Sequence, residues 1–298
     1  MTKRLLSATA SEIRNMNSKE LKAAIIASEG RIIMGETVVT SAPLIAGVTN
    51  AEVMAAFSCD LILLNEYDVF TRYINGMEGV GEPIKEIKRL TAKPLGINLE
   101  PLAVAEESLE DLITLPQGRI ACKETFIEAE KQGVDFILLT GNPATGVTNK
   151  SIEDSISIAK KYFSGLVFAG NMHGAGLSEK VLSQSQVLAY INEGADGVLL
   201  PSAGTIMGVS EEKLSSIADK ARSLGAIVIA AIGTSQESSD TDTIRQIALS
   251  NKRIGADIQH LGDGGFGRMP DVENIMAMSN TIRGKRHTYN RMSISINR

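Results

Sequence analysis

Short apolar runs alternate with amphipathic segments along almost the whole chain. Eight runs predict strands, and several of them, such as LILL, FILL and GVLL, are apolar at nearly every position. Such runs are typical of strands that are buried on both faces of a parallel sheet. The predicted strands are Arg31–Thr40, Asp60–Asn65, Pro94–Leu99, Asp135–Thr140, Gly165–Ala169, Gly197–Leu200, Ala226–Ala231 and Asp257–Leu261.

Helical periodicity fills the intervals between these strands. The predicted helices span 50–58, 83–91, 119–132, 150–163, 178–192, 210–223 and 239–252, and one more follows the last strand at 270–282. Strict alternation indicates an α/β architecture, and eight such units in 298 residues suit a single (β/α)8 TIM barrel. An extra amphipathic helix, Ser11–Glu29, precedes the first strand and ends at Gly30, so we expect it to close the bottom of the barrel.

An internal repeat supports the barrel. The motifs SCDLILL, GVDFILL, GADGVLL and GADIQHL place an aspartate at the start of every second strand, at Asp60, Asp135, Asp196 and Asp257. Duplicated βαβα units would leave such a fourfold pattern, whereas an open doubly wound sheet gives no reason for it. Because the chemistry of these barrels takes place at the carboxyl ends of the strands, we expect these four aspartates to be structural.

The last residues differ in character from the barrel. The predicted parts of the single domain, 1–298, are an N-terminal helix over 1–30, the barrel over 31–282 and a basic tail over 283–298. The alternation in MSISI predicts that the tail docks, either as a strand or across a partner subunit. Arg286, His287 and Arg291 could then complete a neighbour's anion site, so we expect a homo-oligomer that associates through the tail.

Composition narrows the class of protein. Hydrophobic residues make up 43% of the chain, and the formal net charge of −5 argues against a nucleic-acid partner. Cys59 and Cys122 have neither the spacing of a metal site nor a disulfide framework, so we expect a reducing, cytoplasmic location. No run approaches the roughly 18 apolar residues of a membrane span, so we expect no membrane partner.

Carboxylates gather after the first three predicted strands. Glu36 and Glu100 are candidate acid/base catalysts, while Glu66 and Asp68 could hold Mg²⁺ through oxygen ligands and water. Alternatively, these carboxylates only accept hydrogen bonds from neighbouring loops. Amides at the strand ends are candidate substrate ligands, and they are Asn65, Asn98, Asn142 and Asn171.

Glycines and hydroxyls gather after the last three predicted strands. The candidate anion ligands there are Ser202, Gly204, Gly233, Thr234, Gly264, Gly265 and Arg268. Glycine-rich turns expose backbone N–H groups to an anion, and Arg268 would add positive charge. Barrels often bind phosphate with the loops after strands 7 and 8, which here read IGTSQE and LGDGGFG. Alternatively, these glycines form tight turns without a ligand.

Two histidines lie near strand ends. His173, in FAGNMHGAG, follows an apolar strand, so it could be a general acid or base, or a structural histidine bonded to a backbone carbonyl. His260 lies within the last strand, in IQHLGDGG. It is the weaker candidate because its side chain could point either into the barrel or toward the helices.

The turns Gly233–Thr234 and Gly264–Gly265 resemble those of phosphate-binding (β/α)8 barrels, which include sugar-phosphate isomerases, epimerases and indole-forming synthases. The resemblance implies a phosphate held by these turns, although Asp263 precedes the second one and would repel a phosphate unless Arg268 neutralised it. The chain also resembles a bacterial TIM-barrel family without a settled activity, sometimes labelled hydrolase or phosphonomutase-like. The carboxylate positions are loosely similar to those of phosphoenolpyruvate mutase and isocitrate lyase barrels, whose longer signature motifs are not evident.

These features predict an enzyme that acts on a small phosphorylated or carboxylated metabolite, as an isomerase, a lyase or a hydrolase. The loops after strands 7 and 8 would hold the anion, and Glu36, Glu100 and His173 would transfer protons. The alternative function is that of a barrel that binds a metabolite and regulates a partner without turnover.

Overall fold

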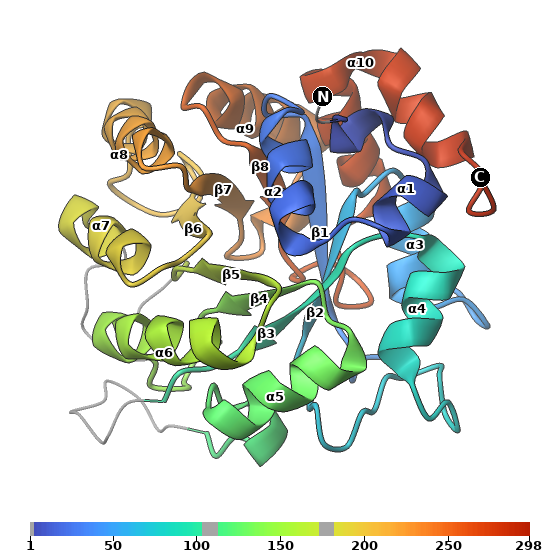
Figure 1. Ribbon diagram of the computed structural model, residues 1–298. Helices are drawn as coiled ribbons and strands as arrows, with labels where there is room; N and C mark the ends of the chain where they lie inside the picture. The colour runs from blue at the N-terminus through green and yellow to red at the C-terminus, as the bar shows by residue number, and fades with distance from the viewer. Residues whose placement is uncertain (1–2, 103–112, 173–181) are drawn as a thin grey trace.

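Eight parallel strands close into a barrel in the computed structural model, which describes residues 3–102, 113–172 and 182–298. Each strand pairs with the next one along the chain, and β8 pairs with β1 (Figure 1). The strands are β1 (Ile32–Val38), β2 (Leu61–Asn65), β3 (Leu95–Leu99), β4 (Phe136–Leu139), β5 (Leu166–Ala169), β6 (Gly197–Pro201), β7 (Ile227–Ile232) and β8 (Ile258–Leu261). The predicted TIM barrel is confirmed, and each predicted strand is present.

Helices follow the strands and surround the barrel (Figure 1). They are α3 (Asn50–Ala56), α4 (Pro83–Thr91), α5 (Lys123–Gln132), α6 (Asn149–Tyr162), α7 (Gln184–Asn192), α8 (Glu211–Ser223), α9 (Thr241–Arg253) and α10 (Val272–Ser293). Single 3₁₀ turns lie at η1 (Leu5–Ser7), η2 (Gln117–Arg119) and η3 (Gln236–Ser238). Each predicted helix between or after the strands corresponds to one of α3 to α10.

The chain before β1 forms two helices, α1 (Ala10–Arg14) and α2 (Ser18–Ile26), where we predicted one. The Asn17 side chain accepts a hydrogen bond from the Glu20 N–H, and the Glu20 carboxylate accepts one from the Asn17 N–H. This capping box begins a new helix at Ser18 and so interrupts the predicted one. Ile25 of α2 belongs to the apolar cluster inside the barrel, so α2 packs against the amino ends of the strands.

The inward-facing side chains change from apolar to polar along the barrel axis. Ile32 and Met34 of β1 and Ile258 of β8 belong to the interior apolar cluster. Successive side chains of a strand alternate between its two faces. The next inward positions toward the carboxyl ends are therefore Glu36 on β1 and His260 on β8, which answers the question of where His260 points.

The four repeated aspartates join each even strand to the odd strand before it. A carboxylate oxygen of each aspartate accepts a hydrogen bond from a backbone N–H at the start of that odd strand. The pairs are Asp60 with Ile33, Asp135 with Leu95, Asp196 with Val167 and Asp257 with Val228. The N–H of each aspartate donates in return to the carbonyl of the same partner. The prediction that these aspartates are structural is confirmed.

Asp60 differs from the other three because two guanidinium groups also bind it. Its side chain is fully buried, Oδ2 accepts from Arg283 Nη1, and Oδ1 accepts from Arg291 Nε at 2.8 Å. Burial by itself would raise the pKa of Asp60, but the two guanidinium groups and Lys93 outweigh it and hold that pKa below its usual value. Asp60 therefore anchors the C-terminal segment to the amino end of the barrel.

The tail continues α10 and does not form the predicted strand. Gly284, with φ of 74°, kinks the helix, which then runs on to Ser293. The prediction of a strand is wrong, because the chain stays helical to Ser293 and the remaining residues form a turn. Arg291 is buried against Asp60, so the expectation that it completes a neighbour's anion site is also wrong. Association of subunits through the exposed part of the tail stays a prediction.

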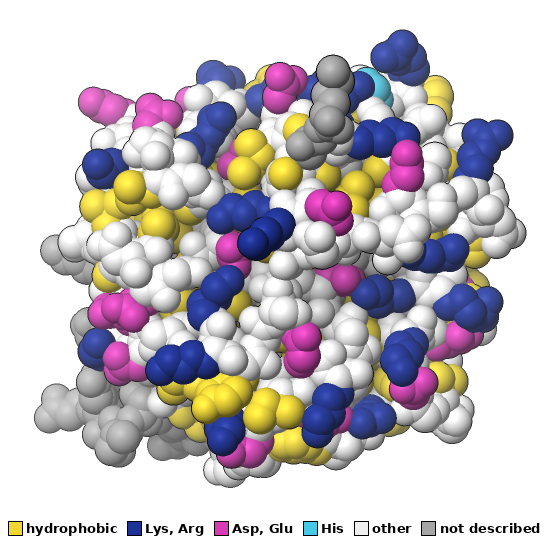
Figure 2. Space-filling model, in the orientation of Figure 1, with side chains coloured by type: hydrophobic (Ala, Val, Ile, Leu, Met, Phe, Trp, Pro, Cys, Tyr) yellow, Lys and Arg dark blue, Asp and Glu magenta, His cyan; other side chains and the backbone are white. Residues whose placement is uncertain are grey.

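The surface carries charges of both signs. On the face that Figure 2 shows, the described Lys and Arg side chains are interspersed with Asp and Glu side chains and do not form one basic surface. Within the described part of the chain, no helix has the length and apolar character needed to cross a membrane.

Replacing Asp60 tests the anchor. In Asp60→Asn the two guanidinium groups lose their buried counter-charge, so we expect the free energy of unfolding to fall by about 3–5 kcal/mol. Asp196→Asn is the matched control, because Asp196 occupies the same place in the repeat but pairs with the half-exposed Lys22 and Lys160, and should lose about 1 kcal/mol or less. Urea denaturation measures both, and equal losses would contradict the anchor.

Candidate active site

Glu36, Asn98 and His260 meet at the carboxyl end of the barrel interior. Asn98 Nδ2 donates to Glu36 Oε1 at 2.6 Å, and His260 Nε2 lies 2.9 Å from Glu36 Oε2. All three side chains are buried. Among the described residues, neither ring nitrogen of His260 nor Asn98 Oδ1 has a hydrogen-bond partner, so the contact between His260 Nε2 and Glu36 is one of proximity. Because buried polar atoms normally have partners, these atoms indicate a place for a ligand or water.

A second polar network extends from β2 to the loop after β3. Asn65 and Asn142 exchange side-chain hydrogen bonds of 2.9 and 3.0 Å, and Asn142 Nδ2 also donates to Glu100 Oε1. Arg119 donates to both oxygens of Glu100, at 3.1 Å from Nε and 3.0 Å from Nη2. Such a bidentate pair neutralises Glu100. Glu100 therefore has a positioning role toward Asn142 and Arg119.

Asp263 connects the second network to Glu36. Asn65 Nδ2 donates to Asp263 Oδ2 at 2.8 Å, and Arg268 Nη2 lies 4.0 Å from Asp263 Oδ1. Burial foremost, and then the charge of Glu36, raise the pKa of Asp263 to about 7, against the lowering effect of Asn65 and Arg268. At neutral pH this carboxyl group is therefore partly protonated and can donate as well as accept a proton.

The glycine loop after β8 surrounds a carboxylate of the chain itself. The Gly264 N–H donates to Glu237 Oε1. A Cβ atom at Gly264 would lie 2.1 Å from that oxygen, and one at Gly265 would lie 2.1 Å from the Met269 carbonyl oxygen. The glycines are thus required by close packing, and the Gly264 amide is not free to bind phosphate. This corrects the expected role of the Gly264 amide, while anion binding by the Gly265 amide stays a prediction.

Glu237 itself was not among the predicted residues. Its side chain is buried, burial raises its pKa, and Oε2 has no hydrogen-bond partner among the described residues. The next helix also uses its own carboxylate, since Asp240 accepts hydrogen bonds from the N–H groups of Asp242 and Thr243 at the start of α9. The Gly264 amide after β8 and the first amides of α9 are therefore occupied by acidic side chains of the chain itself.

The other predicted ligands lie at neighbouring strand ends. Asn171 Oδ1 accepts from the Gly141 N–H at 2.9 Å and so joins the ends of β4 and β5. Ser202 Oγ, after β6, is buried and has no hydrogen-bond partner in the described part of the chain. We call the carboxyl end of the barrel interior the mouth. The turn residues after β6 and β7, on the same side of the mouth as Ser202, are Gly204, Gly233 and Thr234. Of this group, Ser202 is the one whose buried polar atom is left for a ligand.

The two predicted metal ligands have separate partners. Glu66 Oε2 accepts from Thr40 Oγ1 at 3.0 Å, whereas Asp68 Oδ1 accepts from the N–H groups of Phe70 and Thr71 and so stabilises its own loop. Among the described residues, no three His, Cys, Asp or Glu side chains lie together in a way that could hold a metal ion. Glu66 and Asp68 therefore do not fit the expected Mg²⁺ site.

The predicted and the observed site differ most in which histidine lies in it, and in two residues that were not predicted, Arg119 and Glu237. His173 lies outside the described residues, so its predicted role stays a prediction. His260 is the histidine that contacts Glu36, and counting two residues on from Ile258 would have placed it inside the barrel. Arg119 and Glu237 carry no local sequence signal, because each belongs to a connecting loop and meets the site only in the folded chain.

The mouth therefore combines buried carboxylates with few cations. The buried Glu36 and the partly buried Asp263 lie close enough for the charge of Glu36 to raise the pKa of Asp263, and Glu237 adds to this effect. Arg268 is about half exposed, with 54% of its side-chain surface accessible, and lies at the rim. The arrangement can exchange protons with a bound molecule through groups of different protonation state.

Comparison with known proteins gives a family and a fold. The chain belongs to the family described as "Domain of unknown function (DUF7916)", whose model matches residues 6–298. No curated protein matches the sequence.

Several solved structures share the barrel. An archaeal fructose-1,6-bisphosphate aldolase is 14% identical with a TM-score of 0.54, and the match covers 89% of this chain and 99% of the aldolase. A 2,3-dimethylmalate lyase of the phosphoenolpyruvate mutase/isocitrate lyase superfamily is 14% identical with a TM-score of 0.51, covering 87% and 83%. The carboxyl transferase domain of Rhizobium etli pyruvate carboxylase is 12% identical with a TM-score of 0.54. The match covers 96% of this chain but only 53% of the carboxyl transferase chain. The expected resemblance to these barrels is confirmed for the fold.

The link between Glu36 and Asp263 can be measured. Glu36→Gln removes a negative charge that raises the pKa of Asp263, so we expect that pKa to fall below its wild-type value of about 7. Carboxyl ¹³C NMR of aspartate-labelled protein measures the titration, with Glu52→Gln on α3 as the control that should leave it unchanged. A pKa that stays near 7 in Glu36→Gln would show that Glu36 does not act on Asp263.

The same raised pKa affects stability with a defined sign. Between the unfolded value near 4 and the folded value near 7, the folded state binds more protons than the unfolded state, so this contribution to stability decreases as pH rises. Asp263→Asn should therefore flatten the fall of the unfolding free energy between about pH 4 and pH 7 in urea titrations.

Proposed function

We propose that the protein is an enzyme that transfers protons within a small carboxylated or phosphorylated metabolite, as an isomerase or lyase does. The 2.9 Å contact between His260 and Glu36 inside the barrel mouth carries this proposal. The carboxyl ends of the strands are where enzymes of this fold have their active sites. The 2,3-dimethylmalate lyase and the aldolase of similar fold support an enzyme of small metabolites by analogy.

His260 is the proposed proton carrier. Glu36 lies 2.9 Å from Nε2 and would hold a proton there, and neither ring nitrogen has a hydrogen bond to a described residue. A substrate atom within hydrogen-bond distance of Nδ1 could give up or receive a proton there. Asn98 holds the other oxygen of Glu36 at 2.6 Å, so the carboxylate cannot rotate freely and the imidazole keeps its direction.

Asp263 is the proposed second acid/base group. Its raised pKa of about 7 lets it supply a proton at neutral pH, while Glu36 remains paired with His260. Two groups held in different protonation states are what a proton shift across one substrate requires. Glu100 has a positioning role in this scheme, because Arg119 binds both of its oxygens.

The anionic end of the substrate is proposed to bind at the rim. Arg268 is the half-exposed cation there, and its Nη2 lies 4.0 Å from Asp263, a distance that leaves its donors free for a stronger partner. The glycine loop contributes close packing around Glu237 and not an open amide cradle. Protonated Asp263 carries no negative charge and would not compete with the substrate anion for Arg268. We therefore expect binding of the anion and protonation of Asp263 to strengthen each other.

Turnover by point variants tests the proposed function. Small carboxylic acids and sugar phosphates are screened for product, and the best substrate is used with His260→Asn. Loss of the proton carrier should lower kcat by roughly 10²–10⁴-fold, with a smaller change in KM. His287→Asn, on the tail and remote from the mouth, is the matched control and should keep full activity.

Two results would overturn the proposal. One is equal turnover in His260→Asn and the wild type. The other is a metabolite that stabilises the protein and binds His260→Asn equally well but never yields product, which would favour a regulatory barrel.

A further inference from the structure

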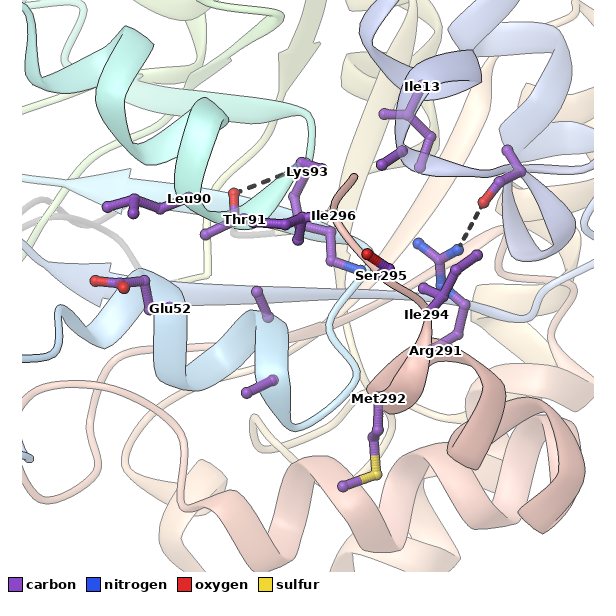
Figure 3. A pocket seen from close by; sticks show the side chains of 15 residues that line it. Ile13, Glu52, Leu90, Thr91, Lys93, Arg291, Met292, Ile294, Ser295 and Ile296 are labelled. Atoms are coloured by element: carbon purple, nitrogen blue, oxygen red, sulfur yellow. Dashed lines mark hydrogen bonds between the residues drawn. The ribbon is translucent and has the colours of Figure 1, made fainter. Parts of the chain in front are cut away.

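A cavity lies at the amino end of the barrel, opposite the candidate active site. Its volume is about 230 Å³, and its walls come from α1, α3, the segment between α4 and β3, and the C-terminal residues (Figure 3). Most of the wall is apolar, and among its residues are Ile13, Leu90, Ile294 and Ile296. The volume is below the roughly 300–1,000 Å³ of pockets for drug-sized ligands, so the cavity suits a small molecule.

Two cations line this otherwise apolar cavity. Lys93 is only 6% exposed, and in Figure 3 its side chain extends from the start of the β3 segment toward Ser295 and Ile296. Its backbone N–H donates to Thr91 Oγ1, while no described residue accepts a hydrogen bond from Nζ. Arg291 is 2% exposed, and its Nη2 has no hydrogen-bond partner in the described part of the chain. Both residues line the cavity, and neither of these two donor atoms has a partner among the described residues.

The charges around the cavity do not balance. Lys93, Arg283 and Arg291 are three buried cations, and Asp60 is the buried carboxylate that pairs with the two arginines. The neighbouring Cys59 thiol is no counter-charge, because burial raises its pKa to about 12. An excess of buried positive charge is costly without a partner.

Glu52 also lines the cavity, but it does not supply the missing charge. Its Oε2 accepts hydrogen bonds from the N–H and the Oγ1 of Thr49, where it caps the start of α3. Burial first, and then Arg291 and Arg283, lower the pKa of Lys93 to about 7, against the opposing charge of Asp60. Lys93 therefore loses its proton more readily than an exposed lysine, which reduces the excess positive charge.

We propose that the amino-end cavity binds a small organic acid, with its carboxylate between Lys93 Nζ and Arg291 Nη2 and its short apolar part against Ile13, Ile294 and Ile296. The carboxylate supplies the missing negative charge and the two missing acceptors. The apolar wall favours a hydrocarbon chain over a fully hydrated inorganic ion. The site is separate from the barrel mouth and does not depend on the proposed activity there.

Calorimetric titration of the full chain with butyrate, and separately with inorganic phosphate, tests the site. Butyrate should bind the wild type at pH 6.5. Its affinity should fall on the order of tenfold by pH 8.5, because binding favours protonated Lys93. Lys93→Met should weaken butyrate binding at least tenfold at pH 6.5 and abolish the pH dependence. Lys85→Met, an exposed lysine on α4, is the matched control and should bind as the wild type does.

A second variant tests the site even if Lys93→Met does not fold. Ala56→Leu fills the cavity from its exposed edge without touching a charged group, and it should also weaken butyrate binding. Equal butyrate affinity in the wild type, Lys93→Met and Ala56→Leu would overturn the proposal, because butyrate would then bind elsewhere. No binding to the wild type in the millimolar range, or tighter binding of phosphate than of butyrate, would overturn it as well.

Discussion

The paired hydrogen bonds between each repeated aspartate and the preceding odd strand fix the register on which the mouth depends. Asp257 both accepts from and donates to Val228, which sets β8 against β7. On its other side β8 pairs with β1, so that His260 lies beside Met34 and within reach of Glu36, two residues further on. A slip of one residue would turn His260 toward the surrounding helices and remove its contact with Glu36. Residues at the amino ends of the strands thus determine which groups meet at the carboxyl ends.

The parts of the structure that follow local rules could be predicted from the sequence. The barrel strands, the helices that follow them and the aspartate repeat are patterns within a few residues, and these were found where they were expected. The division of the N-terminal helix also follows from a local signal, since the Asn17–Glu20 capping box spans four residues. The direction of His260 needed only the two-residue alternation of a strand, counted from Ile258.

The remaining features depend on contacts between distant parts of the chain. Arg283 and Arg291 bind Asp60 across 223 and 231 residues, so no local pattern distinguishes them from the exposed basic residues of the tail. Glu237 occupies the Gly264 amide across 27 residues. A glycine-rich turn looks the same in sequence whether it surrounds a phosphate or a carboxylate of the protein, and this is why the Gly264 amide was predicted as an anion ligand although Glu237 occupies it.

The two ends of the barrel carry excess charge of opposite sign. At the mouth, Glu36, Glu237 and Asp263 repel one another, and partial protonation of Asp263 reduces that repulsion. At the amino end, Lys93 responds to Arg291 and Arg283 by losing its proton more readily. Uncompensated buried charge costs stability, and such costs are typical of sites that bind or react.

Helix α10 contacts both ends of the barrel. Near its start, Asn274 Nδ2 donates to the carbonyls of Glu237 and Ser239 and so supports the loop that holds Glu237 at the mouth. Near its end, Arg291 binds Asp60. Energetic coupling over such a distance is carried best by a rigid element, but the kink at Gly284 separates the two contacts. A ligand at the amino end that fixes Arg291 would therefore stabilise the second half of α10 while leaving Asn274 and the mouth largely unchanged. The geometry favours two sites that act independently in one barrel.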